Sequence, residues 1–344
     1  MPITIQKSNQ LKSIAILMMV CLHLFNRDYE GRFQPLLFIG DQPLSYYISL
    51  FCDACVPIFA FVSGYGLYFN YLRKKNRYQS DNWTRLKKLY LNFWIIIFLF
   101  VIVLGLALQI DGYPGTFQKL VLNLTAIDPS YNGAWWFLTT YILFVLSSEF
   151  WFGILEKINP TFLFVCLLVL YGIGFYFRIY NFAIFENKLG NWLHRQSALY
   201  FCTLFQFMLG AFALKYDWNN KLYSIFKNFK YKNGIILLAV GLLIVGHGIV
   251  PNFIVAPFTG VAFIFLFLQL DLPEFINKAI DFFTSHSTNI WLVHMFFYMI
   301  YFPVFIYGAR YVIPIFLLLL LVSVLSSYVI KVIEKPISLF LFKK

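Results

Sequence analysis

Long apolar segments separated by short polar loops make up most of this 344-residue chain. Segments of about 20 apolar residues are typical of helices that cross a bilayer. Pro57 falls inside the second segment and predicts an irregular start there, because proline disrupts a helix interior. The pattern predicts an all-α polytopic membrane protein with about ten transmembrane helices, near residues 9–26, 44–70, 89–110, 134–153, 160–178, 197–214, 234–250, 252–270, 287–306 and 311–333.

The composition supports this interpretation. Only 12% of the residues are charged and 60% are hydrophobic, whereas soluble domains carry about 25% charged residues. The predicted helices run nearly end to end, so we expect residues 1–344 to form a single membrane domain without an appended soluble domain. The first apolar segment lacks a small-residue cleavage site and is interpreted as a retained helix.

The distribution of basic residues predicts an orientation. The net charge is +12, but the basic residues cluster in particular loops, which argues against a nucleic-acid partner. With both termini in the cytoplasm, 20 of the 27 basic residues fall on the cytoplasmic side and 7 on the other. The sequence therefore predicts a multi-pass protein of the cell membrane with cytoplasmic termini. The outer loops at 27–43, 111–133 and 179–196 are either a lid or acceptor platform, or ordinary connections.

Five cysteines lie in or beside apolar segments. Cys52 and Cys55 form a C-x-x-C pattern, but no second cysteine pair or suitable histidine accompanies it. We therefore expect small buried residues here and predict no metal site.

Lys12 and His23 are the first candidates for chemistry. They are eleven positions apart in LKSIAILMMVCLH, which places both on one face of a helix, about 16 Å apart along its axis. Ionisable groups inside a membrane are costly, and histidine can exchange a proton near neutral pH. His23 is thus a candidate general base for a hydroxyl, and a packing histidine bonded to a neighbouring helix is the alternative.

The loop after the second predicted helix, YLRKKNRYQSDNWTRLKKLY, carries seven basic residues and one acid, Asp81. Such a patch can fix topology or contact anionic lipids. It can also bind a multiply phosphorylated ligand, because Arg and Lys both pair with phosphate. The loop alone does not distinguish these roles.

Four further motifs follow along the chain. CVPIFAFVSGYGLYF places Ser63, Gly64 and Gly66 where another backbone, or an extended substrate, can approach closely. GAWWFLTTY places Trp135 and Trp136 at a predicted helix start, as in an interfacial aromatic belt. TNIWLVHMFF and IEKP are the other two, at residues 288–297 and 333–336.

Taken in order, these segments resemble the acyltransferase 3 family of bacterial integral-membrane acyltransferases, which includes enzymes that O-acetylate surface polysaccharides. LKSIAILMMVCLH is similar to the family's first-helix pattern, with Lys12 where arginine is most common. CVPIFAFVSGY, RLKKLYLNFW, GAWWFLTTY, STNIWLVH and IEKP complete the resemblance, which runs from residue 9 to about 336.

The resemblance implies a membrane-bound O-acyltransferase of the bacterial cell membrane. It would move an acyl group, usually acetyl, from cytoplasmic acetyl-CoA or another acyl-CoA to a hydroxyl of a cell-surface glycan or lipid-linked sugar. His23 matches the essential histidine and Lys12 its paired basic residue. The family's donor-loop motif, Arg-x-x-Arg, has its nearest match at Arg85 and Lys88, followed by the differently spaced Arg73 and Arg77.

On this basis we expect the CoA phosphates to contact Lys12, Arg73, Lys74, Arg77, Arg85 and Lys88. Asp53 is a candidate to orient His23, and pairing with an outer-loop arginine is the alternative. Ser63, Trp136 and His294 are candidates, by polarity, for stabilising an oxyanion. A transporter or flippase for a small anionic or lipid-linked substrate is the alternative function, because it would also explain polar residues inside the helices.

Overall fold

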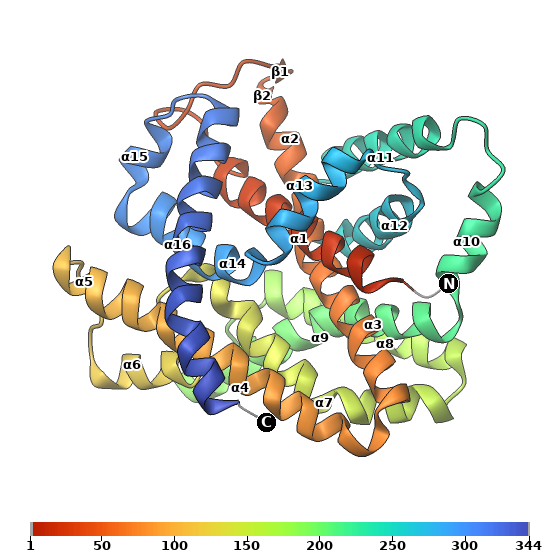
Figure 1. Ribbon diagram of the computed structural model, residues 1–344, viewed down its shortest axis with the longest axis horizontal. Helices are drawn as coiled ribbons and strands as arrows, with labels where there is room; N and C mark the ends of the chain where they lie inside the picture. The colour runs from red at the N-terminus through yellow and green to blue at the C-terminus, as the bar shows by residue number, and fades with distance from the viewer. Residues whose placement is uncertain (1–2, 343–344) are drawn as a thin grey trace.

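The computed structural model describes residues 3–342, and nearly all regular structure in that range is helical (Figure 1). Two strands, β1 (Phe38–Ile39) and β2 (Gln42–Pro43), form a small antiparallel hairpin in the loop after the first helix. The predicted all-α fold is thereby confirmed.

Eight helical segments within residues 3–342 are long and apolar enough to cross a membrane, and three of them contain a local change of helix type. The segments are α1 (Ile5–Phe25); α2 (Leu44–Phe51), joined to α3 (Cys55–Arg73) by a 3₁₀ turn at Cys52–Ala54; α4 (Tyr78–Ile96), preceded by a 3₁₀ turn at Lys75–Arg77 and joined to α5 (Leu104–Ala107) by a π-helical stretch at Ile97–Val103; α7 (Trp136–Lys157), preceded by a 3₁₀ turn at Gly133–Trp135; α8 (Pro160–Ile179); α9 (Lys188–Lys215); α11 (Lys232–Ile249); and α16 (Val312–Leu341).

The other two predicted segments are helical but shorter. Residues 252–270 form the 3₁₀ turn Phe253–Val255 and α12 (Ala256–Gln269). Residues 287–306 form α14 (Ser287–Met295), the π-helical stretch Phe296–Tyr301 and α15 (Pro303–Tyr307), with an interruption at Phe302. The protein is thus a polytopic membrane protein, whereas the orientation of its termini stays a prediction.

Three short helices lie in the connections, where no helix was expected. They are α6 (Phe117–Leu124), α10 (Trp218–Phe226) and α13 (Glu274–Thr284). Helices α5 and α6 lie together at one edge of the molecule, and α10, α11 and α12 lie at the opposite edge (Figure 1).

The irregular start predicted from Pro57 is present. The chain leaves α2 at Phe51, makes a 3₁₀ turn that contains Asp53, and enters α3 at Cys55. Pro57 therefore lies in the first turn of α3, where its missing N–H leaves no hydrogen bond unmade. This turn fixes the position of Asp53. Cys52 and Cys55 are buried and form no disulfide, as expected for small packing residues.

Helix α1 lies near the middle of the molecule, against α3, α13 and α14 (Figure 1). It runs parallel to the segment 284–294, as two hydrogen bonds show: Ser13 is hydrogen-bonded to Thr284, and His23 is hydrogen-bonded to His294. These contacts bring the motifs at both ends of the chain to the same helix face.

Candidate active site

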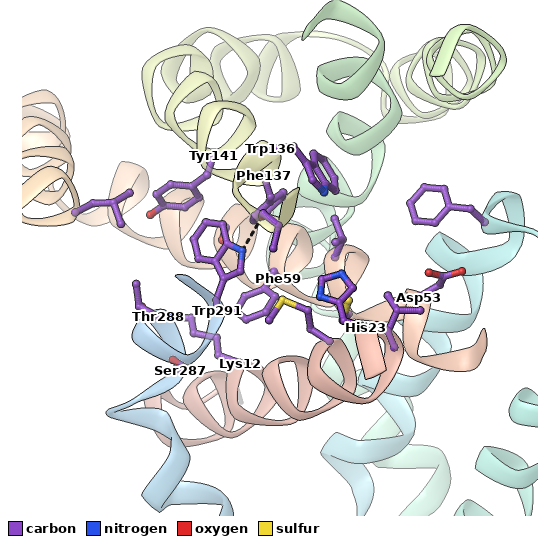
Figure 2. A pocket seen from close by; sticks show the side chains of 18 of the residues that line it. Lys12, His23, Asp53, Phe59, Trp136, Phe137, Tyr141, Ser287, Thr288 and Trp291 are labelled. Carbon is purple, nitrogen blue, oxygen red and sulfur yellow. Dashed lines mark hydrogen bonds between the residues drawn. The ribbon is translucent and has the colours of Figure 1, made fainter. Parts of the chain in front are cut away.

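A cavity of about 520 Å³ extends along α1 from Lys12 to His23. Its walls come from α3, α4, α7, α8 and α14, so segments from the whole chain meet here. Figure 2 shows both side chains rising from α1 into this space, with Trp136, Phe137 and Tyr141 on the opposite wall. The predicted common face of Lys12 and His23 is confirmed, since eleven residues make about three helical turns.

The imidazole of His23 is hydrogen-bonded to a second imidazole. Its Nδ1 lies 2.7 Å from Nε2 of His294 on α14, and the two rings are nearly coplanar, with 3° between their planes. Tyr298 stacks against both rings at 6.5 Å and 5.9 Å. The guanidinium of Arg27 lies 5.0 Å from the centre of the Tyr298 ring. These contacts hold the His23 ring in one orientation.

The surroundings of His294 assign the protons. Its Nδ1 lies 3.0 Å from the carbonyl oxygen of Ile290 and 2.8 Å from that of Trp291. A nitrogen that faces two acceptors carries the hydrogen, so Nε2 of the neutral ring is an acceptor. Nδ1 of His23 must then donate to it. The remaining nitrogen of His23, Nε2, keeps its lone pair, and it makes no hydrogen bond within residues 3–342.

This arrangement differs from the first of the two roles considered for Asp53, which was to orient His23. Asp53 lines the cavity, but the hydrogen bond that orients His23 comes from His294. Asp53 instead lies within electrostatic range of Arg178 at the end of α8. His294 in turn has both ring nitrogens engaged, which leaves it no hydrogen to donate to an oxyanion. The hydroxyl of Ser63 and the indole of Trp136 line the cavity without a hydrogen bond inside the described range.

Two of the six residues predicted to bind the donor reach the cavity. Lys12 and Arg85 line its end opposite His23, where Arg85 is held by a 2.8 Å hydrogen bond to Asn82. Neither takes part in a salt bridge within residues 3–342. A buried cation usually has an anionic partner, so this end is suited to an anionic ligand.

The other four predicted residues are exposed and do not line this cavity; they are Arg73, Lys74, Arg77 and Lys88. Lys74 forms a salt bridge with Asp81 at 3.1 Å. Arg73 lies over the ring of Phe69, and Lys88 over that of Phe342. Their proposed contacts with the donor stay predictions.

The aromatic-belt interpretation of Trp135 and Trp136 is wrong. Trp135 is fully buried and donates its indole N–H to the carbonyl oxygen of Leu292 at 2.9 Å. Trp136 lines the cavity, where its ring lies 4.6 Å from the guanidinium of Arg178. The helix begins inside the bundle because the segment before it, residues 117–135, folds back against α4; Trp94 of α4 donates to the carbonyl oxygen of Leu124.

Sequence reasoning missed several lining residues. Arg178 is one of the seven basic residues predicted on the outer side, and its place in the last turn of an apolar helix is a signal that could have identified it. Trp291 was also missed. It donates to the carbonyl oxygen of Ala134 at 2.9 Å and joins α14 to the start of α7 (Figure 2). Its spacing of three residues from His294 places both on neighbouring parts of α14.

Comparison with known proteins agrees with this architecture. The sequence model of one protein family, described as an acyltransferase domain, matches residues 5–332, nearly the whole chain. No curated protein and no solved structure matches the chain.

Proposed function

The chain belongs to this family of acyltransferase domains, and from that premise we propose that it is an O-acyltransferase in which His23 is the general base. The observation that carries the proposal is the hydrogen-bonded pair of imidazoles. With Nδ1 of His23 engaged by His294, Nε2 is the nitrogen of His23 that keeps a lone pair, and His23 lines the cavity. A base must present a free lone pair to the hydroxyl it activates.

The donor in this proposal is acetyl-CoA. Lys12 and Arg85 bind its phosphate-bearing portion, and the acyl thioester extends along α1 toward His23. The spacing supports this division of roles, because Lys12 and His23 are about 16 Å apart along the helix axis. The two unpaired cations and the cavity of about 520 Å³ are the features that support an anionic, elongated donor.

The reaction is a transfer of the acyl group to a hydroxyl of a glycan or lipid-linked sugar. His23 Nε2 accepts the hydroxyl proton while the hydroxyl oxygen bonds to the thioester carbonyl carbon. The carbon–sulfur bond then breaks, and the departing sulfur takes the proton from His23 Nε2. Ser63 and Trp136 line the cavity, and in this proposal they donate hydrogen bonds to the transient oxyanion. His23 ends each cycle neutral, with its hydrogen bond to His294 unchanged.

An acetyl-transfer assay tests the proposal. Purified full-length protein in detergent is incubated with radiolabelled acetyl-CoA and candidate cell-surface glycans. His23→Ala should lower the turnover number by about 10²- to 10⁴-fold, the usual contribution of a general base. His247→Ala is the matched control, because it also removes a buried imidazole but lies outside the cavity. An active His23→Ala protein would exclude His23 as the base.

The same assay examines the donor end. Arg85→Gln should raise KM for acetyl-CoA by about tenfold, the value of one charge-assisted hydrogen bond, with a smaller change for the glycan. Lys88→Gln should have less effect, because Lys88 does not line the cavity. Equal changes for donor and acceptor would contradict the assignment. Absence of any thioester consumption by the wild type would favour the transporter alternative.

A further inference from the structure

A second chamber of about 330 Å³ adjoins the His23 end of the cavity. Its walls include Trp136, Phe177, Arg178, Phe182 and Arg195, and we call it the two-arginine chamber. Trp136 and Arg178 also line the main cavity, so the two spaces share a wall. A molecule that fills the chamber therefore lies next to the His23 end.

Both arginines of the chamber lack a carboxylate at ion-pair distance. No salt bridge within residues 3–342 includes Arg178 or Arg195. Asp53 lies near enough to Arg178 to offset part of its charge. Arg195 is exposed on α9 and has no such partner among the described residues. The chamber therefore has an uncompensated positive charge.

Arg178 is held in place before any ligand binds. Its guanidinium lies 4.6 Å from the centre of the Trp136 ring and 4.5 Å from that of the Phe253 ring, and it donates to Sγ of Cys202 at 3.9 Å. A guanidinium fixed in this way loses little conformational entropy when it binds a carboxylate or phosphate, because its forked pair of N–H donors is already oriented. A helix dipole also favours a cation at the end of α8, but it does not account for the neighbouring Arg195.

The remaining walls are aromatic and apolar. Trp136, Phe177 and Phe182 line the space, and Phe182 is 69% exposed. Aromatic faces pack well against the C–H faces of sugar rings, and guanidinium groups bind carboxylate or phosphate in a forked geometry. The combination suits a sugar that bears an acidic group.

We propose that the two-arginine chamber is the acceptor subsite and that the acceptor is an acidic glycan. Arg178 and Arg195 bind a carboxylate or phosphate on the acceptor, while a hydroxyl of the same molecule reaches His23. Only one part of this inference, that the acceptor hydroxyl reaches His23, rests on the proposed acyl transfer. Binding of an acidic glycan in the chamber does not require turnover.

Equilibrium binding to full-length protein in phosphatidylcholine nanodiscs tests the inference. The probes are tetragalacturonate, its uncharged methyl ester, and a maltotetraose carrying one phosphate. At low salt, one or both acidic probes should bind about tenfold tighter than the ester, as expected for one forked ion pair. A preference for tetragalacturonate would identify a carboxylate acceptor, and a preference for the phosphorylated sugar would identify a phosphate acceptor.

Variants locate the effect. Arg195→Gln should remove most of the preference for acid, and Arg195→Lys should restore only part of it, because lysine lacks the fork. Arg32→Gln is the matched control, since Arg32 is also exposed but lies in the loop after α1. Equal binding of acidic and neutral probes, or an unchanged preference in Arg195→Gln, would overturn the inference. So would an effect of Arg195→Gln seen only with phosphatidylglycerol in the nanodisc, which would indicate a lipid-headgroup site.

The outcome is separable from that of the proposed function. His23→Ala should keep its affinity for the acidic probe while losing acetyl transfer. In an active system, Arg195→Gln should raise KM for the acidic glycan and leave KM for acetyl-CoA unchanged. If the wild type bound the acidic probe but transferred no acyl group, the acyltransferase proposal would be contradicted. The chamber would still be assigned as a binding site for an acidic glycan.

Discussion

At the scale of single residues, the chemistry depends on which nitrogen of His23 is free. The sequence contains both histidines, but two backbone carbonyls of α14 decide which nitrogen donates and which accepts in the bond between them. Those carbonyls fix the hydrogen on Nδ1 of His294, and His294 then fixes the hydrogen on Nδ1 of His23. His294 is therefore a positioning residue in the proposed reaction and acts through His23.

We expect His294→Ala to lower the turnover number by about 10²-fold, because His23 would lose the acceptor that holds its orientation. KM for acetyl-CoA should change little. His294→Gln should recover part of the activity, since its amide oxygen can accept from Nδ1 of His23. Steady-state acetyl transfer measures both, with thermal unfolding in detergent as the check on folding. Equal losses in the two variants would indicate a packing role only.

At the scale of elements, the site depends on the close approach of α3 and α9. A Cβ on Gly64 would lie 1.8 Å from the carbonyl oxygen of Phe207, and a Cβ on Gly210 would lie 2.0 Å from that of Phe61. Small residues permit such backbone contacts between membrane helices. The close approach expected near Gly64 is confirmed, whereas Gly66 faces open space. Ser63 and Asp53 are carried by the same helical segment and are placed by this contact.

Gly64→Ala should destabilise the protein by about 1–3 kcal/mol or more, because the added methyl overlaps backbone that cannot move aside. Gly66→Ala is the matched control in the same helix, and it should be neutral or slightly stabilising because alanine favours a helix. Thermal unfolding of the two purified variants in one detergent measures the difference. Equal melting temperatures would show that α3 and α9 separate readily.

At the scale of the whole molecule, the cavity joins two electrostatically different ends. Lys12 and Arg85 line one end, and His23, Asp53 and Arg178 line the other. The proposed function needs the Lys12 end to face the cytoplasm, where acyl-CoA is available. The 20-to-7 division of basic residues predicts this orientation.

Cysteine labelling tests the orientation. In a variant lacking the five native cysteines, Asp41→Cys should react with a membrane-impermeant maleimide in intact spheroplasts. Asn76→Cys should react only after the membrane is opened. Both positions are exposed, Asp41 in the turn between β1 and β2 and Asn76 in the 3₁₀ turn before α4, so access to the reagent depends on the side of the membrane. The reverse pattern would place the Lys12 end outside and contradict a cytoplasmic donor.

The sequence alone determined the helical membrane architecture and the common face of Lys12 and His23. Both follow from local rules, since span length and helical periodicity are properties of neighbouring residues. The partner of His23, the pocket position of Trp136 and the chamber at Arg195 were decided only by the tertiary structure. These features join residues far apart in the chain, such as His23 with His294, and periodicity within one helix carries no information about which helix packs beside it.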